Sequence, residues 1–237
     1  MSISLRAFLN IGKGIGRTLL PQDCLLCQGA SGGRLLCQAC ARELPTTASA
    51  CPRCAAPGAD TSECGACIAD PPHYDASCAA FTYAYPVDAL IQAFKYGGQL
   101  ALAGLFAQAL YRRIGSAGDV DLIVPLPLHS ARLAERGFNQ AAEVAKVLSR
   151  LSGIAMDPRR ARRVRNTAAQ TALPWRERAT NMRGAFACDA NLDGLSIAVV
   201  DDVMTTGATL DEFARTLKKS GAARVENWVV ARTARDV

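Results

Sequence analysis

Eight of the ten cysteines in the chain form two copies of one spacing pattern, and this repeat limits how the first third of the chain can fold. Each copy is CxxC, nine residues, and a second CxxC. The cysteines are Cys24, Cys27, Cys37 and Cys40 in the first copy and Cys51, Cys54, Cys64 and Cys67 in the second. Four thiolates suit tetrahedral Zn²⁺ in a closed structural site. Because a module of about 50 residues rarely builds an adequate core, metal would supply its folding energy. The sequence predicts a double zinc ribbon over residues 21–75 with one or two Zn²⁺ ions.

The pairing of the cysteines is left open by the spacing. Sequential pairing, in which each copy holds its own ion, follows from the repeat, and interleaved pairing is the alternative. Cys78 and Cys188 stand alone, and we expect them to be buried core thiols.

The start of the chain does not resemble an export signal. Within residues 1–20, Asn10, Lys13 and Arg17 interrupt the apolar residues, and no small-residue cleavage site follows. We expect an amphipathic helix over residues 1–20 and, from the metal-binding thiols, a reducing and hence cytoplasmic compartment. No run of about 18 apolar residues occurs, so we do not expect an integral membrane protein.

The formal net charge of +6 arises in the second part of the chain. Residues 1–75 contain six Lys or Arg and six Asp or Glu, whereas residues 76–237 contain 21 and 15. Two zinc ions with four thiolates each would lower the total from +6 to +2. This modest basic balance suits an anionic small ligand at least as well as nucleic acid.

From residue 76 onward, strand and helix patterns alternate. Strands are expected at 77–85, 120–124, 195–200 and 225–231, and helices at 87–96, 100–113, 139–151 and 209–220. The alternation predicts an α/β domain over residues 76–237, with a mostly parallel sheet and helices on both faces. Residues 159–183 have no clear apolar period and predict a long loop, which inside a compact domain is usually functional.

The most informative segment is 197–210, which has the sequence IAVVDDVMTTGATL. A buried strand ends in Asp201 and Asp202, and a hydroxyl-rich loop leads into a helix. The backbone N–H groups and hydroxyls of residues 205–209 can wrap a phosphate, with Gly207 allowing close approach beside the positive end of the helix. The two acids can accept hydrogen bonds from ribose hydroxyls or position hydrated Mg²⁺. The segment therefore predicts a sugar phosphate site.

This segment resembles the phosphoribosyl pyrophosphate signature of type I phosphoribosyltransferases at every defining position. With the cysteine pairs and the segments FKYG (94–97), VPLP (124–127) and RGFNQ (136–140), nearly the whole chain resembles the ComF family. The resemblance implies a type I phosphoribosyltransferase-like fold behind the zinc-ribbon module. It also implies a role in DNA uptake by competent bacteria, or in nucleotide salvage, and leaves the acceptor substrate unassigned.

The resemblance also implies a site for phosphoribosyl pyrophosphate, with Mg²⁺ bound to the ligand. Asp201 and Asp202 are the expected catalytic pair, beside the positive charge that develops on the sugar. The expected substrate-binding residues are Val203, Met204, Thr205, Thr206, Gly207, Ala208, Thr209, Leu126, Lys95, Arg136 and Arg165.

Four of these residues have individual roles under the resemblance. Leu126 begins the loop that holds the pyrophosphate, and Lys95 and Arg136 lie beside the departing phosphates, with Arg132 close by. Arg165 begins a loop that extends to Asn181 and closes over the site.

Three functions remain open at this point. The first is phosphoribosyl transfer or exchange, and the second is non-catalytic binding of phosphoribosyl pyrophosphate or a nucleotide. The third is an accessory role in binding single-stranded DNA, with the zinc ribbons and Arg159, Arg160, Arg162 and Arg163 as the contacts. We expect His73 and His129 to make ordinary polar contacts.

Overall fold

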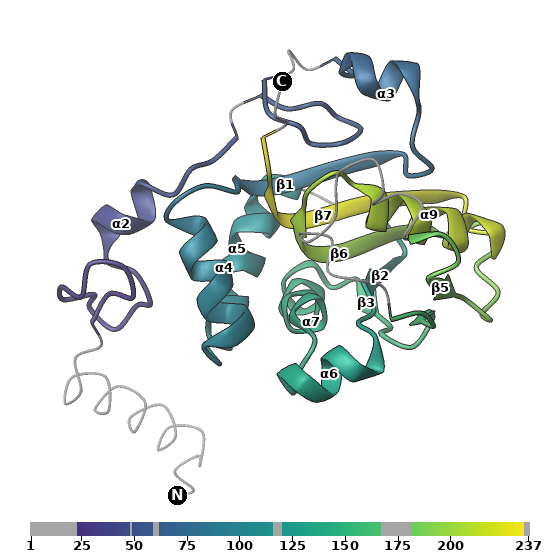
Figure 1. Cartoon of the computed structure of the whole chain (residues 1–237). Coiled ribbons are helices and arrows are strands. Elements are labelled where there is room, and N and C mark those ends of the chain that lie inside the picture. Colours follow the sequence, from purple (N-terminus) through teal and green to yellow (C-terminus); the bar gives the residue numbers. More distant parts are fainter. Residues whose placement is uncertain (1–22, 48, 59–61, 116–119, 167–181, 235–237) are drawn as a thin grey trace, which may run out of the picture. The chain divides into compact units, whose positions relative to one another are not determined.

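The computed structural model describes residues 23–47, 49–58, 62–115, 120–166 and 182–234, and Figure 1 shows the order of the elements. These residues form two compact units, one that ends at Leu44 and one that begins at Pro45. The helix expected over residues 1–20 lies outside the described residues. The domain division expected between residues 75 and 76 stays a prediction.

The first unit is built around the first four cysteines. Backbone hydrogen bonds from Cys24 N to Gly29 O (2.8 Å) and from Leu25 N to Leu35 O (3.0 Å) fold the chain back on itself. The short helix α2, Gln38–Arg42, follows, and the Cys37 side chain caps it by accepting a hydrogen bond from the Cys40 N–H.

The second unit contains a five-stranded, all-parallel sheet with the order β1-β7-β6-β2-β3. Its strands are β1 (Ala76–Thr82), β7 (Arg224–Arg232), β6 (Ser196–Met204), β2 (Leu122–Pro125) and β3 (Ala155–Met156). Parallel strands need crossover connections, and helices provide them. The expected mostly parallel sheet is therefore confirmed.

Helices cover both faces of this sheet. The helices that contact its strands are α5 (Leu102–Ile114), α7 (Gln140–Ser152) and α9 (Ala208–Lys219), and the same unit also contains α4 (Val87–Tyr96) and α6 (Ser130–Arg136). Successive strand residues point to opposite faces, and Val199 and Val229 share a core cluster with Phe213 of α9. The neighbouring Val200 and Val230 are also fully buried, on the face where α5 and α7 contact β6 and β7.

The second tetracysteine unit packs into the same core as the sheet. Cys51, Cys54 and Cys67 belong to the buried cluster that contains Val229 and Phe213. The short helix α3, Gly65–Ala69, carries Cys67. Backbone hydrogen bonds from Ser77 N to Pro52 O (3.0 Å) and from Thr82 N to Pro45 O (2.8 Å) join the unit to β1. The second group of four cysteines is thus part of the same compact unit as the sheet.

From residue 76 onward, the expected strands and helices are all present, with ends that differ by a few residues, and the described residues of this part contain four further elements that were not expected. These are α6, β3 and the antiparallel pair of β4 (Arg162–Arg163) with β5 (Phe186–Ala187). β4 lies in the expected long loop, and residues 167–181 of that loop lie outside the described residues. Strand β6 continues through Met204, so the two acids lie within the strand. Among the described residues, none of the helices is long and apolar enough to cross a bilayer.

Candidate functional site

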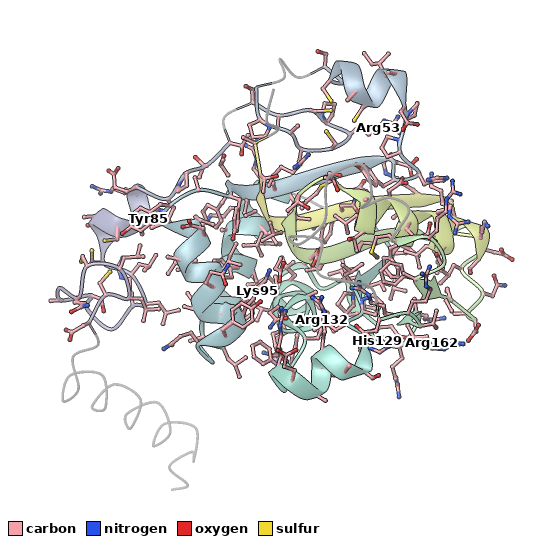
Figure 2. All side chains as sticks on the ribbon, viewed as in Figure 1. Arg53, Tyr85, Lys95, His129, Arg132 and Arg162 are labelled. Carbon is pink, nitrogen blue, oxygen red and sulfur yellow. The ribbon has the colours of Figure 1, made fainter. Side chains whose placement is uncertain are left out.

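The two acids lie toward the carboxyl end of β6, which is flanked by β2 and β7. The backbone N–H of Asp202 donates a hydrogen bond to Asp201 Oδ1 at 2.8 Å. Lys95, which comes from the last turn of α4 (Figure 2), places its Nζ 2.9 Å from Asp202 Oδ1. The side chains of Lys95 and Asp202 are only 18% and 14% exposed, so the ion pair is largely shielded from water.

This arrangement changes the protonation behaviour of the pair. Burial, together with repulsion from Asp202, raises the pKa of Asp201 to about 7, although Lys95 and Arg163 act in the opposite direction. Burial by itself lowers the pKa of Lys95, but the charge of Asp202 and the hydrogen bond to it outweigh this, so the net pKa is raised. The site therefore holds one ion pair and one carboxyl group that titrates near neutral pH.

The loop at the end of β6, residues 203–209, contains the glycine that caps the next helix. Gly207 adopts the left-handed conformation, with φ 87°, and caps α9. The Ala208 N–H donates to Thr206 Oγ1 at 3.3 Å. Met204 and Gly207 are buried, whereas the three threonines of the loop, Thr205, Thr206 and Thr209, are partly exposed. The loop thus leads directly into the amino terminus of a 12-residue helix.

Gly207 is also confined by its neighbours. A Cβ atom built at this position would lie 2.9 Å from Met204 Cε and 3.0 Å from Tyr74 Oη. A larger residue here would therefore have to displace the ends of the Met204 and Tyr74 side chains, in addition to the strain of the positive φ.

Leu126 lies at the end of the neighbouring strand β2. It is buried, its N–H donates to Val200 O at 2.9 Å, and its carbonyl accepts from Asn139 Nδ2 at 3.0 Å. The following residues lead into α6, where the His129 ring accepts a hydrogen bond from Ala131 N at 3.3 Å. This ordinary capping contact is what the sequence suggested for His129.

Two of the expected arginines are engaged with other groups. Arg136 donates to Gln140 Oε1 at 3.0 Å and to Tyr96 Oη at 3.2 Å, and its guanidinium lies 5.1 Å from the centroid of the Tyr96 ring. Arg165 donates to the backbone carbonyl of Arg183. The positive charge of Arg136 also acts on Lys95, and by itself this repulsion lowers the pKa of Lys95. Lys95 is thus the expected cation that contacts one of the two acids, Asp202, directly.

Arg163 is a residue near the site that the sequence did not assign to it. Its guanidinium lies 5.7 Å from the centroid of the Phe186 ring, and Phe186 packs edge-on against Phe213 of α9. Burial and repulsion from Arg132 lower the pKa of Arg163, and attraction to Asp201 partly offsets this. The sequence placed Arg163 in a run of arginines, where no periodicity indicated strand β4.

The eight repeated cysteines form two metal-ligand groups with sequential pairing. The Sγ atoms of Cys24, Cys27, Cys37 and Cys40 all lie within 4.8 Å of one another, as do those of Cys51, Cys54, Cys64 and Cys67. Four thiolates at this spacing fit tetrahedral Zn²⁺. Cys78 and Cys188 belong to neither group, and both are partly buried. Burial raises the pKa of Cys78 to about 11, so this thiol stays protonated at neutral pH.

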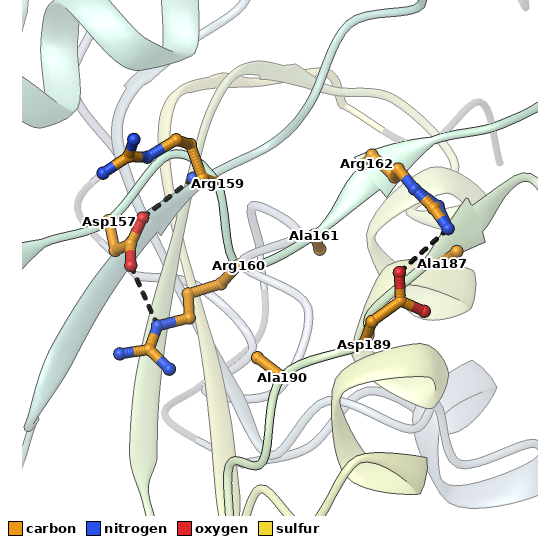
Figure 3. Close-up of a pocket in the computed structure, with 8 residues that line it drawn as sticks. All are labelled: Asp157, Arg159, Arg160, Ala161, Arg162, Ala187, Asp189 and Ala190. Atoms are coloured by element: carbon orange, nitrogen blue, oxygen red, sulfur yellow. Dashed lines mark hydrogen bonds and ion pairs between the residues drawn. The ribbon is translucent and has the colours of Figure 1, made fainter.

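A separate basic pocket of about 350 Å³ lies beside strands β4 and β5 (Figure 3). Its lining includes Arg159, Arg160 and Arg162, but two acids balance part of this charge. Arg160 Nε lies 2.9 Å from Asp157 Oδ2, and Arg162 lies 2.9 Å from Asp189 Oδ2.

Comparison with known proteins identifies two families along the chain. Residues 15–68 match the family described as "Double zinc ribbon domain", and residues 107–236 match "Phosphoribosyl transferase domain". The chain is 35% identical to DNA utilization protein YhgH of Salmonella typhimurium over 205 residues, which is 84% of this chain and 90% of that protein. It is 30% identical to Competence protein F of Haemophilus influenzae over 226 residues, which is 88% of this chain and 96% of that protein. Among solved structures, it is similar to the purine phosphoribosyltransferase of Pyrococcus horikoshii Ot3 at 17% identity and a TM-score of 0.32, over 59% of this chain and 85% of that one.

Proposed function

Because the chain belongs to the ComF family, in which a double zinc ribbon precedes a phosphoribosyl transferase domain, we propose that it binds phosphoribosyl pyrophosphate or a closely related sugar pyrophosphate. We propose further that it transfers or exchanges the phosphoribosyl group. The names of its relatives support a link of this activity to DNA uptake or DNA utilization. The process is proposed to take place in the cytoplasm, where thiolate sites of this kind stay reduced.

The observation that carries the proposal is that the two acids continue directly into the loop of residues 203–209 and the amino terminus of α9. Asp201 and Asp202 lie near the carboxyl end of strand β6, and five residues separate Asp201 from the glycine cap of α9. A sugar bound beside the acids would place its 5-phosphate at the loop of residues 203–209. There the backbone N–H groups of residues 205–209 and the threonine hydroxyls would hold it.

The reaction proposed here needs positioning and charge stabilisation more than covalent help. A nucleophile attacks C1 of the ribose, the C1–O bond breaks, and pyrophosphate leaves with the bonding electron pair. Asp201 and Asp202 would lie beside the positive charge that develops on the sugar. Leu126 and the residues after it would contact the pyrophosphate, and Lys95 and Arg136 would lower the cost of its negative charge. Arg165 would belong to the segment that closes over the ligand.

Mg²⁺ fits this donor set, because carboxylates and hydroxyls are the oxygen ligands that it prefers. When bound with the ligand, Mg²⁺ would neutralise charge on the pyrophosphate. Asp201 and Asp202 would hold it through its water shell.

Binding and turnover can be tested separately. Calorimetric titration of the zinc-loaded protein with Mg²⁺ and phosphoribosyl pyrophosphate should give saturable binding, and the Asp201→Asn/Asp202→Asn variant should lose it while keeping the same circular dichroism spectrum. Exchange of labelled pyrophosphate into phosphoribosyl pyrophosphate tests transfer of the group. Binding without exchange would reduce the function to that of a non-catalytic sensor, and unchanged affinity in the double variant would refute the site.

A second candidate function is binding of single-stranded DNA. The basic pocket beside β4 and β5 favours it, as do relatives named for DNA utilization and competence. The pairing of Arg160 with Asp157 and of Arg162 with Asp189 leaves a modest positive charge there, so affinity at this surface alone should be weak.

A further inference from the structure

A fully buried arginine connects the second tetracysteine unit to the candidate phosphate loop. Arg232, near the end of β7, has no exposed surface. Its Nε donates to the carbonyl of Cys54 at 2.9 Å, and its Nη1 donates to Met204 O at 3.1 Å and also to the carbonyl of Thr205. One guanidinium therefore holds the backbone of a cysteine ligand and of two residues of the loop, Met204 and Thr205.

The planar guanidinium group is suited to this task. It presents several donors in fixed directions, so the position of one bound carbonyl restricts the positions of the others. Met204 O also accepts a hydrogen bond from Thr233 N at 3.1 Å, which extends the β6–β7 pairing to the start of the loop. A shift of the Cys54 carbonyl would therefore move or release the backbone of Met204 and Thr205.

Burial of a charged guanidinium is costly unless hydrogen bonds and opposite charge compensate it. Backbone carbonyls supply part of this compensation at Arg232. A Zn²⁺ ion with four thiolates carries a net charge of −2 at Cys51, Cys54, Cys64 and Cys67. Since Cys54 provides both a thiolate to that site and a carbonyl to Arg232, the loaded site supplies counter-charge next to the guanidinium.

Tyr74 and His73 make further contacts between the same two regions. Arg53, between Cys51 and Cys54, donates to Tyr74 O at 3.2 Å and pairs with Glu63 at 2.9 Å (Arg53 is labelled in Figure 2). The hydroxyl of Tyr74 lies against Gly207. His73 N donates to Asp211 Oδ1 at 2.6 Å, in the first turn of α9.

We propose that Arg232 is a positioning residue for the phosphate loop, and that the zinc ion of the second tetracysteine group, but not that of the first, keeps this loop in its binding conformation. The proposal rests on the proposed function for the identity of the ligand. The coupling itself is independent of the proposed function, because it concerns only how firmly the backbone of residues 203–209 is held.

The repeat offers a matched pair of variants for the test, because Cys37 and Cys64 occupy the same position in the two units. Cys37→Ser and Cys64→Ser are each compared with the unchanged chain for zinc content, amide hydrogen exchange of residues 203–209, and affinity for Mg²⁺ with phosphoribosyl pyrophosphate. Both variants should lose one zinc ion. Only Cys64→Ser should exchange faster in the loop and bind more weakly, by about tenfold or more.

Substitution of Arg232 tests the positioning role in zinc-replete protein, should Cys64→Ser fail to fold. Arg232→Met should retain both ions, exchange faster at residues 203–209 than in the rest of the sheet, and lose affinity. Arg232→Lys, which keeps the charge on a single donor nitrogen, should recover part of the affinity. A merely structural role would instead raise exchange throughout the sheet, with no local excess in the loop.

The outcomes are distinguishable. Unchanged loop exchange in Arg232→Met, or equal effects of Cys37→Ser and Cys64→Ser, would overturn the coupling whatever the unchanged protein binds. In a different outcome, the unchanged protein does not bind phosphoribosyl pyrophosphate, but residues 203–209 exchange faster in Cys64→Ser and Arg232→Met and not in Cys37→Ser. That result would overturn the proposed function and uphold the coupling.

Discussion

The ammonium group of Lys95 lies 2.9 Å from the carboxylate of Asp202, and this contact joins the end of α4 to the end of β6. Two adjacent acids on one strand repel each other, and Lys95 compensates one of them inside a largely shielded site. The ion pair therefore neutralises the charge of Asp202 and lowers the net negative charge of the site to that of Asp201.

Replacing Lys95 with methionine should leave Asp202 without its partner. We expect a loss of about 1–3 kcal/mol in the free energy of unfolding, below the range for a fully buried pair because both side chains keep some exposure. Urea denaturation measures this. The Lys95→Met/Asp202→Asn double variant should regain part of the loss, and additive losses would show that the pair is not coupled.

Protonation of Asp201 should make stability depend on pH. Its pKa is raised to about 7 in the folded protein, whereas an unfolded aspartate titrates near 4. The folded state thus binds more protons between these values, so the free energy of unfolding should fall as pH rises from about 4 to about 7. Thermal melts across this window, without ligand or Mg²⁺, compare the unchanged chain with Asp201→Asn. The variant should lose this part of the pH dependence, and an identical pH profile would contradict the raised pKa.

Alanine at Gly207 should disrupt the loop more than alanine at another left-handed glycine. Gly207→Ala places a Cβ atom against Met204 Cε and Tyr74 Oη, whereas Gly153 has a similar φ of 77° with nothing within 4 Å of the added atom. Gly153→Ala should cost about 1–2 kcal/mol from backbone strain alone. Gly207→Ala should cost more and should also abolish binding of the sugar pyrophosphate. Chemical denaturation and calorimetry measure the two effects, and equal costs would show that Tyr74 does not confine the loop.

The acids beside the basic pocket provide a test of nucleic-acid binding in which affinity should rise. Asp157→Asn/Asp189→Asn removes the partners of Arg160 and Arg162, so affinity for an oligothymidylate should increase and fall more steeply with salt. Replacement of Arg159, Arg160 and Arg162 by glutamate should reduce it. Fluorescence anisotropy at several salt concentrations gives both slopes. An affinity that neither variant changes would place any DNA-binding surface elsewhere.

The sequence predicted the elements whose patterns are local and regular. Strand β6, helix α9 and the loop between them follow from one apolar run, two acids and a glycine, and the position of the acids at the ligand-binding edge follows from the parallel sheet. The exact repeat of the cysteine spacing was compatible with sequential and with interleaved pairing, and the positions of the Sγ atoms in the structure select the sequential one.

Other features depend on contacts that no local pattern contains. β3, β4 and β5 have two residues each, too few for any periodicity to appear. The hydrogen bond from Arg232 to Cys54 joins residues 178 positions apart. From sequence alone, an arginine at the end of a strand is expected to be exposed to solvent. The sequence also did not predict that the second tetracysteine group packs against the sheet. Its core residues Ala55 and Ala56 have small side chains and belong to no longer apolar run, so no local pattern indicated their burial.

The pairing of β1 with β7 has a consequence for the order in which the protein acquires its structure. Ala76 pairs with Glu226, so β1 gains its neighbour only after the ribosome has made β7, whereas each cysteine quartet is complete within a short stretch of newly made chain. Metal capture should therefore precede closure of the sheet, and pulse-labelled hydrogen exchange during refolding should find β6 protected before β1. Until then β1 lacks its partner strand, and an unpaired strand can pair with the wrong chain.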